Sequence, residues 1–568
     1  MARFSLLPAL ASVLLASRTL AATVTVNWDI TWVNAAPDGF SRPVIGINGA
    51  WPCPTLEATA GDIIQLTINN QLGNETTGLH FHGIDQVQTP WMDGPSGVTQ
   101  CPVPPGSSIT YTFVANAPGT YWYHSHNMGQ YPDGLRGPFI VHDPNDPYAG
   151  KYDEEIVLTV SDWYHDQSLT LVRNMLESSN TQFLPPFPDG IVVNEGRGAN
   201  ISFAGNKTYR VRIISFAAFA STLLQFDSHT MQVIMADASY VTQAQAYQLR
   251  IAPAQRYDVL ISGIARDHRN YPFLLSLDIN RDFANDPPQA VVWPHNATGY
   301  LVMDSSGAFP QDVVSLWQPL DDLSLRALDG AAAYGPVAQT ITLNFDFCID
   351  ANGLPRACFN GQPYIAQKVP TLYSVATTGA NNTNPAVYGD VNPFILATGS
   401  VVTVVVNNLD TAIHPFHMHG HQFQVLDRPA SNAGVWGGHN RTFPASPMRR
   451  DTISINPNSY AVLRIQITNP GVFLFHCHIE WHVEMGLTAT LIQSPELLRN
   501  ASFPQDHIDN CIKQGIPYQG NAAGNTQDVL DTSDFVTVPP TTYTGALYSA
   551  PTDCPAPLRA RRVRRRLD

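Results

Sequence analysis

The chain is poor in charge and has no long apolar stretch. Charged residues make up 14% of its 568 residues and hydrophobic residues 44%, a balance typical of folded globular proteins rather than disordered ones. After the N-terminus no run of about 20 consecutive apolar residues occurs that could span a bilayer, so we expect a soluble mature protein without a membrane anchor. The net charge of −15 argues against nucleic acid as a partner, because a phosphate backbone requires a basic surface.

Basic residues do gather at the C-terminus. The cluster consists of Arg559, Arg561, Arg562, Arg564, Arg565 and Arg566. It could contact an anionic surface or be cut by a protease specific for basic residues. A disordered, solvated tail is the simpler interpretation.

The N-terminus has the pattern of a secretory signal. Arg3 precedes an apolar run over residues 4–16, and small residues follow at 19–22. We predict that residues 1–21 are a signal peptide and that the mature protein is secreted to the extracellular space or the cell wall. Sequons of the form N-x-S/T agree with this route and predict a glycoprotein. They lie at Asn74, Asn200, Asn206, Asn296, Asn381, Asn440 and Asn500.

The most informative segment is His476-Cys477-His478-Ile479-Glu480-Trp481-His482. Successive side chains of a β-strand point to opposite faces, so Cys477 would face one way and its two histidine neighbours the other. A thiolate with two imidazoles is the ligand set of an electron-transfer copper, whereas imidazoles alone suit copper that binds oxygen. The segment therefore predicts a strand that joins two copper sites.

Three further histidine clusters precede this segment. They are His80-Phe81-His82, His124-Ser125-His126 and His414-Pro415-Phe416-His417-Met418-His419. One such pair would be weak support for a metal site, because surface or core histidines explain most of them. Four pairs with a cysteine inside the last are not explained in that way.

The four clusters, HFHG, HSH, HPFHMHGH and HCHIEWH, make the chain resemble the multicopper oxidases over residues from about 24 to 500. The resemblance implies four copper ions: one of type 1, one of type 2 and a type 3 pair. It assigns His414, Cys477 and His482 to the type 1 copper, and His80 and His417 to the type 2 copper. The type 3 ligands would be His82, His124, His126, His419, His476 and His478.

The same resemblance gives roles to Leu487, Asp93 and Glu480. Leu487 stands ten residues after Cys477, where the family places the axial residue of the type 1 copper. Leucine cannot coordinate, and a missing ligand in an apolar environment is expected to raise the copper potential. Asp93 and Glu480 match acidic positions near the oxygen-reducing copper, where a carboxylate can relay protons or orient histidines.

Six of the seven cysteines remain when the cysteine of the HCH segment is assigned to copper. An even number in a secreted chain predicts three disulfides. Cys348 and Cys358 are close enough in sequence for a local loop. The resemblance to fungal laccases implies a Cys101–Cys511 pair that ties the C-terminal tail to the first domain, which leaves Cys53–Cys554 by subtraction.

Two stretches of the chain repeat two others. Similar strand-like segments beginning at Gly61 and Gly399 lead to the HFHG and HPFHMHG clusters, and segments beginning at Pro118 and Pro470 lead to HSH and HCH. The first and last domains are therefore expected to be duplicates that form an eight-histidine site at their interface.

Short alternating strands with Pro and Gly turns predict Greek-key β-sandwiches, which the resemblance narrows to cupredoxin-like domains. We predict an all-β chain of three such domains at 22–145, 146–310 and 336–500. Residues 311–335 would be a linker, and residues 501–568 a C-terminal tail that wraps back.

For the activity, we predict a laccase-like oxidase that takes single electrons from a small aromatic compound, such as a phenol or a polyketide-type pigment precursor, and reduces O2 to water. The resemblance places Phe219 where secreted laccases carry the carboxylate that receives the phenol proton. Phenylalanine can stack on an aromatic ring but cannot accept a proton.

The alternative is a soluble ferroxidase that oxidises Fe(II) to Fe(III). Asp410 matches one of the carboxylates with which fungal ferroxidases bind iron, whereas Pro185 stands in place of a glutamate. The remaining aspartate would be Asp278 or Asp282. A copper-binding storage protein without activity fits less well, because the full ligand set is present. The oligomeric state is open.

Overall fold

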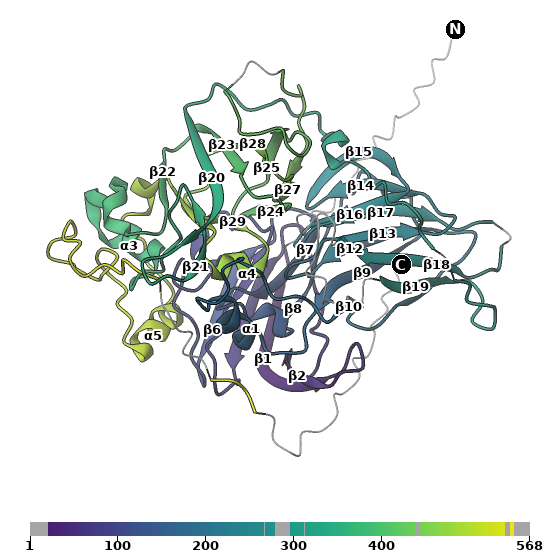
Figure 1. Cartoon of the computed structure of the whole chain (residues 1–568), viewed down its shortest axis with the longest axis horizontal. Coiled ribbons are helices and arrows are strands. Elements are labelled where there is room, and N and C mark those ends of the chain that lie inside the picture. The colour runs from purple at the N-terminus through teal and green to yellow at the C-terminus, as the bar shows by residue number, and fades with distance from the viewer. Residues whose placement is uncertain are drawn as a thin grey trace, which may run out of the picture.

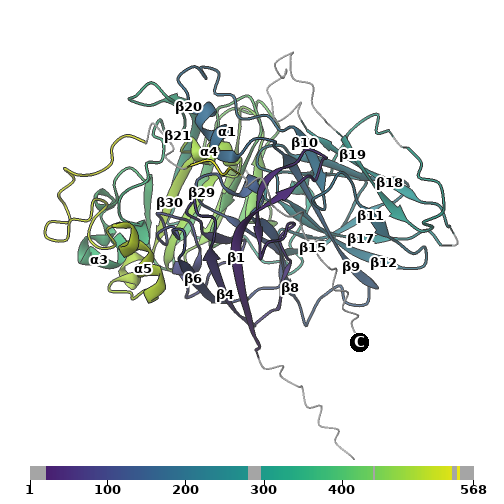
Figure 2. The same cartoon turned by 90° about the horizontal axis from the view of Figure 1, so that it is seen from below.

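The structure is a computed structural model that describes residues 21–539 and 546–549, apart from 266, 279–295, 312 and 439–441. Within this part of the chain the strands form six sheets, which follow one another as three pairs (Figures 1 and 2). The predicted all-β class with cupredoxin-like domains is confirmed. The predicted signal peptide, apart from Ala21, and the arginine cluster lie outside the described residues.

The first pair consists of a sheet with the order β2-β1-β4-β6 and a sheet with the order β3-β8-β7-β5. Its strands are β1 (Thr23–Ala35), β2 (Arg42–Ile47), β3 (Leu56–Thr59), β4 (Ile63–Asn70), β5 (Leu79–His82), β6 (Ser108–Val114), β7 (Gly119–Ser125) and β8 (Arg136–His142). In β4 and β6 every second side chain is buried, as expected of strands that cover a core with one face. By contrast, β5 and β7 are buried along their whole length, so both of their faces are covered.

The second pair has the orders β10-β9-β12-β17-β14-β15 and β11-β19-β18-β13-β16. Its strands are β9 (Glu154–Trp163), β10 (Gly190–Val193), β11 (Asn200–Ser202), β12 (Thr208–Ser215), β13 (Thr222–Phe226), β14 (Met231–Ala236), β15 (Ser239–Ala246), β16 (Gln248–Ile251), β17 (Arg256–Ser262), β18 (Tyr271–Leu277) and β19 (Asn296–Val302). It forms the teal right-hand part of Figure 1.

The third pair has the orders β21-β20-β23-β28-β25-β26 and β22-β30-β29-β24-β27. Its strands are β20 (Gln339–Ile349), β21 (Pro355–Phe359), β22 (Pro393–Leu396), β23 (Val401–Asn408), β24 (His414–Met418), β25 (Phe423–Asp427), β26 (Arg449–Arg450), β27 (Thr452–Ile455), β28 (Ser459–Gln466), β29 (Gly471–Cys477) and β30 (Thr488–Gln493). His417 on β24 lies opposite His476 on β29, as His80 on β5 lies opposite His124 on β7. The two halves of the predicted repeat thus share one arrangement of strands.

The helical elements are short. They are α1 (Ser168–Met175), α3 (Thr371–Thr377), α4 (Glu480–Glu484) and α5 (Gln505–Gln514), with the 3-10 turns η1 (Pro90–Met92), η2 (Tyr131–Asp133), η3 (Asp322–Ser324), η4 (Gly379–Thr383), η5 (Pro385–Tyr388) and η6 (Pro495–Leu498). Helix α4 begins shortly after β29 and carries the last histidine of the HCHIEWH segment.

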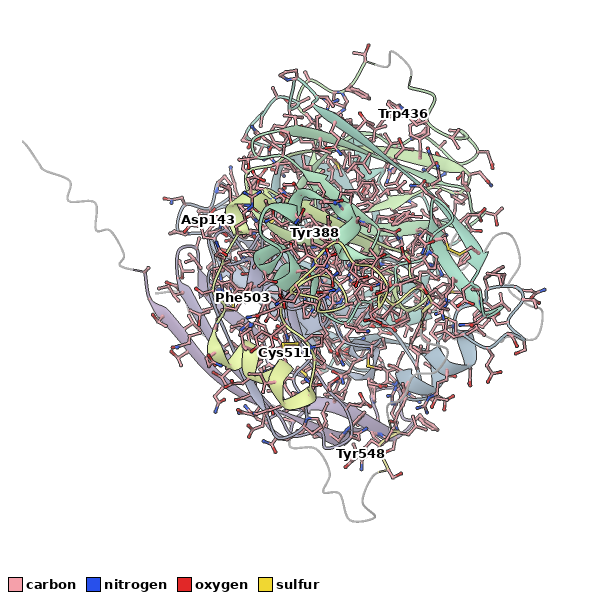
Figure 3. The ribbon with its side chains drawn as sticks, turned by 90° about the vertical axis from the view of Figure 1, so that its left-hand side faces the viewer. Asp143, Tyr388, Trp436, Phe503, Cys511 and Tyr548 are labelled. Atoms are coloured by element: carbon pink, nitrogen blue, oxygen red, sulfur yellow. A yellow bond between two sulfur atoms is a disulfide. The ribbon has the colours of Figure 1, made fainter. Side chains whose placement is uncertain are left out.

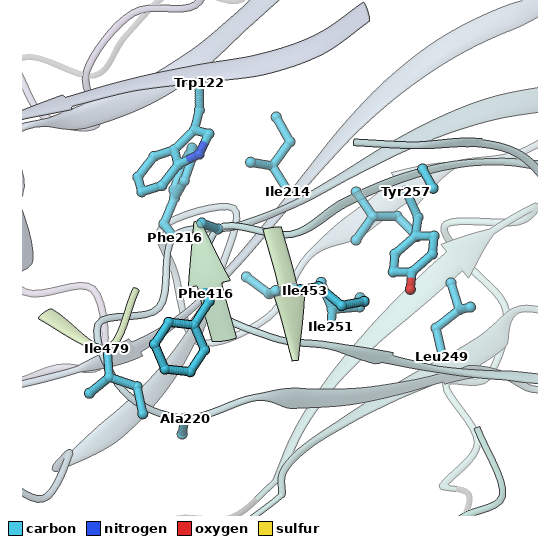
Figure 4. Close-up of a cluster of buried hydrophobic side chains, with 14 of the residues drawn as sticks. Trp122, Ile214, Phe216, Ala220, Leu249, Ile251, Tyr257, Phe416, Ile453 and Ile479 are labelled. Carbon is cyan, nitrogen blue, oxygen red and sulfur yellow. The ribbon is translucent and has the colours of Figure 1, made fainter. Parts of the chain in front are cut away.

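A continuous apolar core crosses from one sheet pair to the next. Figure 4 shows Trp122 of the first pair and Ile214, Phe216 and Tyr257 of the second near Phe416 and Ile453 of the third. These side chains are almost completely buried. Packing, and not only the connecting chain, therefore fixes the three pairs relative to one another.

The tail returns to the first sheet pair. Helix α5 is joined to it by the disulfide Cys101–Cys511 (Figure 3), and Cys348–Cys358 links β20 to β21. Both predicted pairs are confirmed. Within the described residues Cys53 forms no disulfide, and its predicted partner Cys554 lies outside them. Further along, Tyr548 stacks on Trp32 with 4.7 Å between the ring centroids.

Candidate metal centre

Histidines from all four predicted clusters meet between the first and third sheet pairs. The ring of His80 lies 4.0 Å from that of His419, and the ring of His82 lies 3.7 Å from that of His417. The eight-histidine cluster, as we call it, consists of His80, His82, His124, His126, His417, His419, His476 and His478. All are buried except His126, which is half-buried. The strand period of two puts both histidines of each pair on one face.

Hydrogen bonds fix which ring nitrogen is available. The Nδ1 atoms of His80, His124 and His417 lie 2.8, 2.9 and 2.9 Å from the carbonyl oxygens of Asp93, Ser125 and Asp451. In a neutral imidazole one nitrogen donates and the other accepts. Nδ1 therefore carries the proton, and Nε2 presents a lone pair to the cluster.

Several of these lone pairs have no partner. The Nε2 atoms of His80, His124 and His417 are buried and make no hydrogen bond with any described residue. His82 is reversed: its Nε2 lies 3.2 Å from Asp451 Oδ1, and its buried Nδ1 has no described partner. Buried polar atoms are normally satisfied, so converging orphan nitrogens indicate a position for bound metal.

The rings are also in the protonation state that metal binding requires. Burial is the main cause that lowers the pKa of the cluster histidines named in the next sentence. They are His82, His124, His126, His417, His419, His476 and His478. Neutral imidazoles in this number suit copper.

A second group lies on the other face of β29. Cys477 Sγ is 3.9 Å from His414 Nδ1 and 3.6 Å from His482 Nδ1, and all three side chains are buried. Burial raises the pKa of the Cys477 thiol, so a thiolate there needs a cation beside it. This triad, with two imidazole nitrogens and one sulfur, fits an electron-transfer copper.

Leu487 borders the triad. Its carbonyl oxygen accepts a hydrogen bond from Cys477 N at 3.2 Å, and its N–H donates to His482 O at 2.9 Å. The leucine is completely buried. Its contacts agree with a place beside the type 1 copper, and the axial role stays a prediction.

The main chain links the two groups directly. Cys477 of the triad is bonded on either side to His476 and His478 of the cluster, whose rings lie 5.5 Å apart. An electron that enters at the triad therefore has a covalent route of one residue to the cluster. The arrangement separates a one-electron site from a site with room for several metal ions.

The predicted acids lie near the cluster. Asp93 is completely buried, with Oδ2 2.8 Å from His419 Nδ1, and its carbonyl oxygen holds His80. Glu480 lies in the first turn of α4, two residues after His478, and burial raises its pKa well above the usual range.

Asp451 was not predicted from the sequence. Its Oδ1 lies 3.2 Å from His82 Nε2 and 3.6 Å from His417 Nδ1. Both of its oxygens accept from Arg256, at 2.7 and 2.6 Å. Burial alone would raise the pKa of Asp451, but Arg256 holds it well below its usual range. The only sequence signal was the similarity of Met448-Arg-Arg-Asp-Thr to the family, which does not show what the aspartate contacts.

A buried ionic network surrounds this aspartate. Asp237 accepts from Arg450 Nε and Nη2 at 3.0 and 2.8 Å, and Arg450 Nη1 donates to Asp322 at 2.8 Å. Asp237 follows β14, Asp322 begins η3 in the predicted linker, and Arg450 lies in β26. The network therefore connects the second sheet pair, the linker region and the third pair next to the cluster.

Asp410 touches the triad from the solvent side. Its Oδ2 lies 2.8 Å from His414 Nε2, and its side chain is 21% exposed. Burial opposes ionisation, but the hydrogen bond from His414 lowers the pKa of Asp410 to about 2. Asp278 is paired with Arg250 at 2.6 Å, and Asp282 lies outside the described residues. Phe219 is buried in the core of the second sheet pair.

Within the described residues, no helix has both the length and the apolar character needed to cross a membrane.

The chain belongs to the multicopper oxidase family. Three family models, each described as multicopper oxidase, match residues 29–146, 154–296 and 364–496. The protein is accordingly an oxygen-using oxidase with four copper ions, one of type 1, one of type 2 and two of type 3.

Curated relatives match almost the whole chain. "Iron transport multicopper oxidase fetC" of Epichloe festucae is 48% identical over 540 residues, which cover 93% of this chain and 86% of the relative. "Iron transport multicopper oxidase FET3" of Saccharomyces cerevisiae is 37% identical, covering 90% and 82%.

Solved structures agree with this family. The crystal structure of Fet3p, described as a multicopper oxidase that functions in iron import, has a TM-score of 0.86 and 35% identity, and covers 92% of this chain and 100% of that chain. The laccase from Botrytis aclada has a TM-score of 0.76 and 26% identity, covering 88% and 93%.

Proposed function

We propose that this oxidase is a ferroxidase that takes electrons from Fe(II) at Asp410 and His414. The observation that carries the proposal is the 2.8 Å contact between Asp410 Oδ2 and His414 Nε2. An ionised carboxylate is a hard oxygen ligand that suits a hard cation. The relatives named as iron transport oxidases support the same donor. They favour it over the laccase-like activity and the pigment substrate that we predicted first from the sequence.

The individual ligand assignments belong to the same proposal. His414, Cys477 and His482 would hold the type 1 copper, and His80 and His417 the type 2 copper. The type 3 pair would be held by His82, His124, His126, His419, His476 and His478. Copper bound in these sites supplies one-electron transfer at the triad and reduction of O2 to water at the cluster.

The protein's own groups set the geometry of that reaction. Asp410 would bind Fe(II) and, through its hydrogen bond, place it against the His414 ring. The residue order His476-Cys477-His478 supplies the covalent path to the cluster. Asp93 orients His419 and, with Glu480, would move protons toward the oxygen that is reduced. The apolar Leu487 side chain, which cannot coordinate, would keep the reduction potential of a copper held by the triad high.

A phenol is the second candidate donor, and a specific feature favours it. The Phe347 ring lies 5.4 Å from the His482 ring and stacks with Phe183 at 5.2 Å. Aromatic side chains of this kind could pack against a phenol beside the triad. The iron site also has fewer carboxylates than expected. Among the described residues Asp410 is the carboxylate that contacts the triad, and Pro185 replaces the expected glutamate.

Secretion by the predicted signal peptide is part of the proposal. We infer a glycosylated protein that acts outside the cell or in the cell wall. The sequons and the two disulfides support this compartment, because disulfides persist in oxidising environments.

Steady-state kinetics of the purified protein on Fe(II) and on a panel of phenols tests the donor. We expect the higher kcat/KM for Fe(II). Asp410→Ala should lower kcat/KM for Fe(II) by more than about tenfold, or about 1.4 kcal/mol, and change that for phenols by less. Asp304→Asn, at an exposed carboxylate outside both metal groups, is the control. A higher kcat/KM for a phenol, unaffected by Asp410→Ala, would favour the second candidate.

A further inference from the structure

A cavity of about 400 Å³ lies beside the eight-histidine cluster. Its walls come from the loop after β5, the start of β7, the turn between β14 and β15, the predicted linker and the third sheet pair. The walls are mostly apolar but include several polar side chains, and a cavity of this size has room for several water molecules.

The inner wall of the cavity is formed at Gly83, directly after His82. Gly83 has φ +91°, and a Cβ there would lie 2.6 Å from Arg256 Nη2 and 2.9 Å from Asp451 Oδ2. The missing side chain lets the Asp451 carboxylate approach the wall. The other oxygen of this carboxylate lies 3.2 Å from His82 Nε2.

Polar side chains line the way from the cavity to Asp451. Gln422 lines the cavity, and its Nε2 donates to Asp451 Oδ2 at 3.4 Å. Ser239, on the same wall, donates to Gln422 Oε1 at 2.6 Å. Water in the cavity thus meets an unbroken row of hydrogen-bonding groups that ends at a cluster histidine.

Asp85 lines the same cavity and is half-buried. Within the described residues its carboxylate makes no hydrogen bond or ion pair with a protein group. Burial, followed by the charge of Asp451, raises the pKa of Asp85 to about 7. It can therefore take up and release a proton near neutral pH.

The other charged and titratable groups on the walls have partners of their own. Arg449 Nη2 lies 2.7 Å from Asp329, and Arg256 holds Asp451. The hydroxyl groups of Tyr121 and Tyr240 donate to the carbonyl of Ala117 and to the carboxylate of Asp143. Asp85 is therefore the acid that faces the cavity without such a partner among the described residues.

Reduction of O2 to two water molecules consumes four electrons and four protons, and the cluster that performs it is buried. We propose that protons reach the cluster through this cavity, and that the Asp85 carboxylate relays them from solvent to the water in the cavity. Asp85 accepts a proton from solvent and donates it to cavity water beside Gln422 and Asp451. That water passes a proton on toward the cluster, where it ends on oxygen from O2. The route does not depend on which donor supplies the electrons. It reaches the cluster at Asp451, which contacts His82, whereas Asp93 contacts His419.

The reaction of the fully reduced holoenzyme with O2, followed by stopped flow across pH 7, tests this route. In wild type the reoxidation rate should fall as the pH rises through about 7, because Asp85 loses its proton. Asp85→Asn should be at least about tenfold slower below that pH and lack this pH dependence. Asp85→Glu should restore both. Anaerobic reduction of the blue copper should be the same in all variants, and Asp329→Asn, on the same cavity, should match wild type.

Infrared spectra of the copper-free protein provide a readout that does not depend on activity. Wild type should show protonated-carboxyl absorption that disappears as the pH rises through about 7. The Asp85 share of it should be missing in Asp85→Asn, while the share of Glu75, whose pKa burial also raises to about 7, should remain. An unchanged reoxidation rate and pH profile in Asp85→Asn would overturn the proposal. So would the absence of the Asp85 share of this absorption, or an equal slowing of copper reduction and reoxidation, which would indicate a purely structural effect.

Discussion

At the scale of single residues, the position of a residue along its strand determines whether its side chain belongs to the triad or to the eight-histidine cluster. The alternation of side chains along β29 predicted that Cys477 and its neighbouring histidines separate, and the structure places them in the triad and the cluster. Asp93 contacts His419 and Asp410 contacts His414, while the roles that the resemblance gave them stay predictions. Asp451 could not be found from spacing, because its contact with His82 joins residues 369 positions apart.

Cys477→Ser should abolish the intense blue absorption and leave most copper at the histidine cluster. A thiolate gives that charge-transfer band, and the remaining ligands of the chain's metal groups are imidazoles. Visible spectra and copper content of the purified variant measure both effects. A variant that stays blue would remove Cys477 from the type 1 site.

Leu487→Met should lower the reduction potential of the type 1 copper. A thioether is a weak donor that stabilises oxidised copper more than an apolar side chain does. Redox titration of the blue band in both proteins decides this, and Met485→Leu, which alters another buried side chain three residues after His482, is the control. An equal or higher potential in Leu487→Met would contradict the axial position of Leu487.

At the scale of elements, the alternation of buried and exposed residues predicted strands such as β4 and β6 well. The strands that carry the site, β5, β7, β24 and β29, are buried throughout. Their hydrophobicity therefore does not show which face of each strand carries the metal ligands. The spacing of the histidines shows it. The ionic network around Arg450 remained hidden, because its members come from elements far apart in sequence.

Asp237→Asn should destabilise the contact between the second and third sheet pairs. The change removes one of the two carboxylates that pair with the buried Arg450, the other being Asp322, and loss of one partner of a buried ion pair costs about 3–5 kcal/mol. Chemical denaturation of the copper-loaded protein measures the loss. Asp304→Asn, at an exposed site, should change stability by less than about 0.5 kcal/mol. Equal stability of both variants would contradict a structural role of the network.

At the scale of the whole molecule, the short alternating strands predicted an all-β fold, and the even number of cysteines left after copper binding predicted disulfides. The resemblance to fungal laccases, and not the spacing, implied the Cys101–Cys511 pair. The sequence could not predict how closely the sheet pairs pack, since the shared core in Figure 4 depends on side chains from all three. The domain boundaries proposed from the sequence stay predictions. The electron donor also could not be predicted from the sequence, because one carboxylate beside the triad is compatible with Fe(II) and with a phenol.

Joint replacement of Cys101 and Cys511 by serine should loosen the C-terminal tail. The disulfide closes a loop of 410 residues, and removal of such a link costs about 2–4 kcal/mol. Limited proteolysis should then cut near α5 while the blue colour persists. Replacement of Cys348 and Cys358, which close a loop of ten residues, should leave α5 protected. Protection of α5 in both variants would show that packing alone holds the tail.

The central claim is that donor oxidation and O2 reduction occur at separate sites joined through Cys477. It is tested most directly with Cys477→Ser that has been chemically reduced and then mixed with O2. A single turnover of O2 consumption should persist, because the histidine cluster is intact, while steady-state O2 consumption with Fe(II) should be lost. Steady Fe(II) oxidation at the wild-type rate in this variant would contradict the claim.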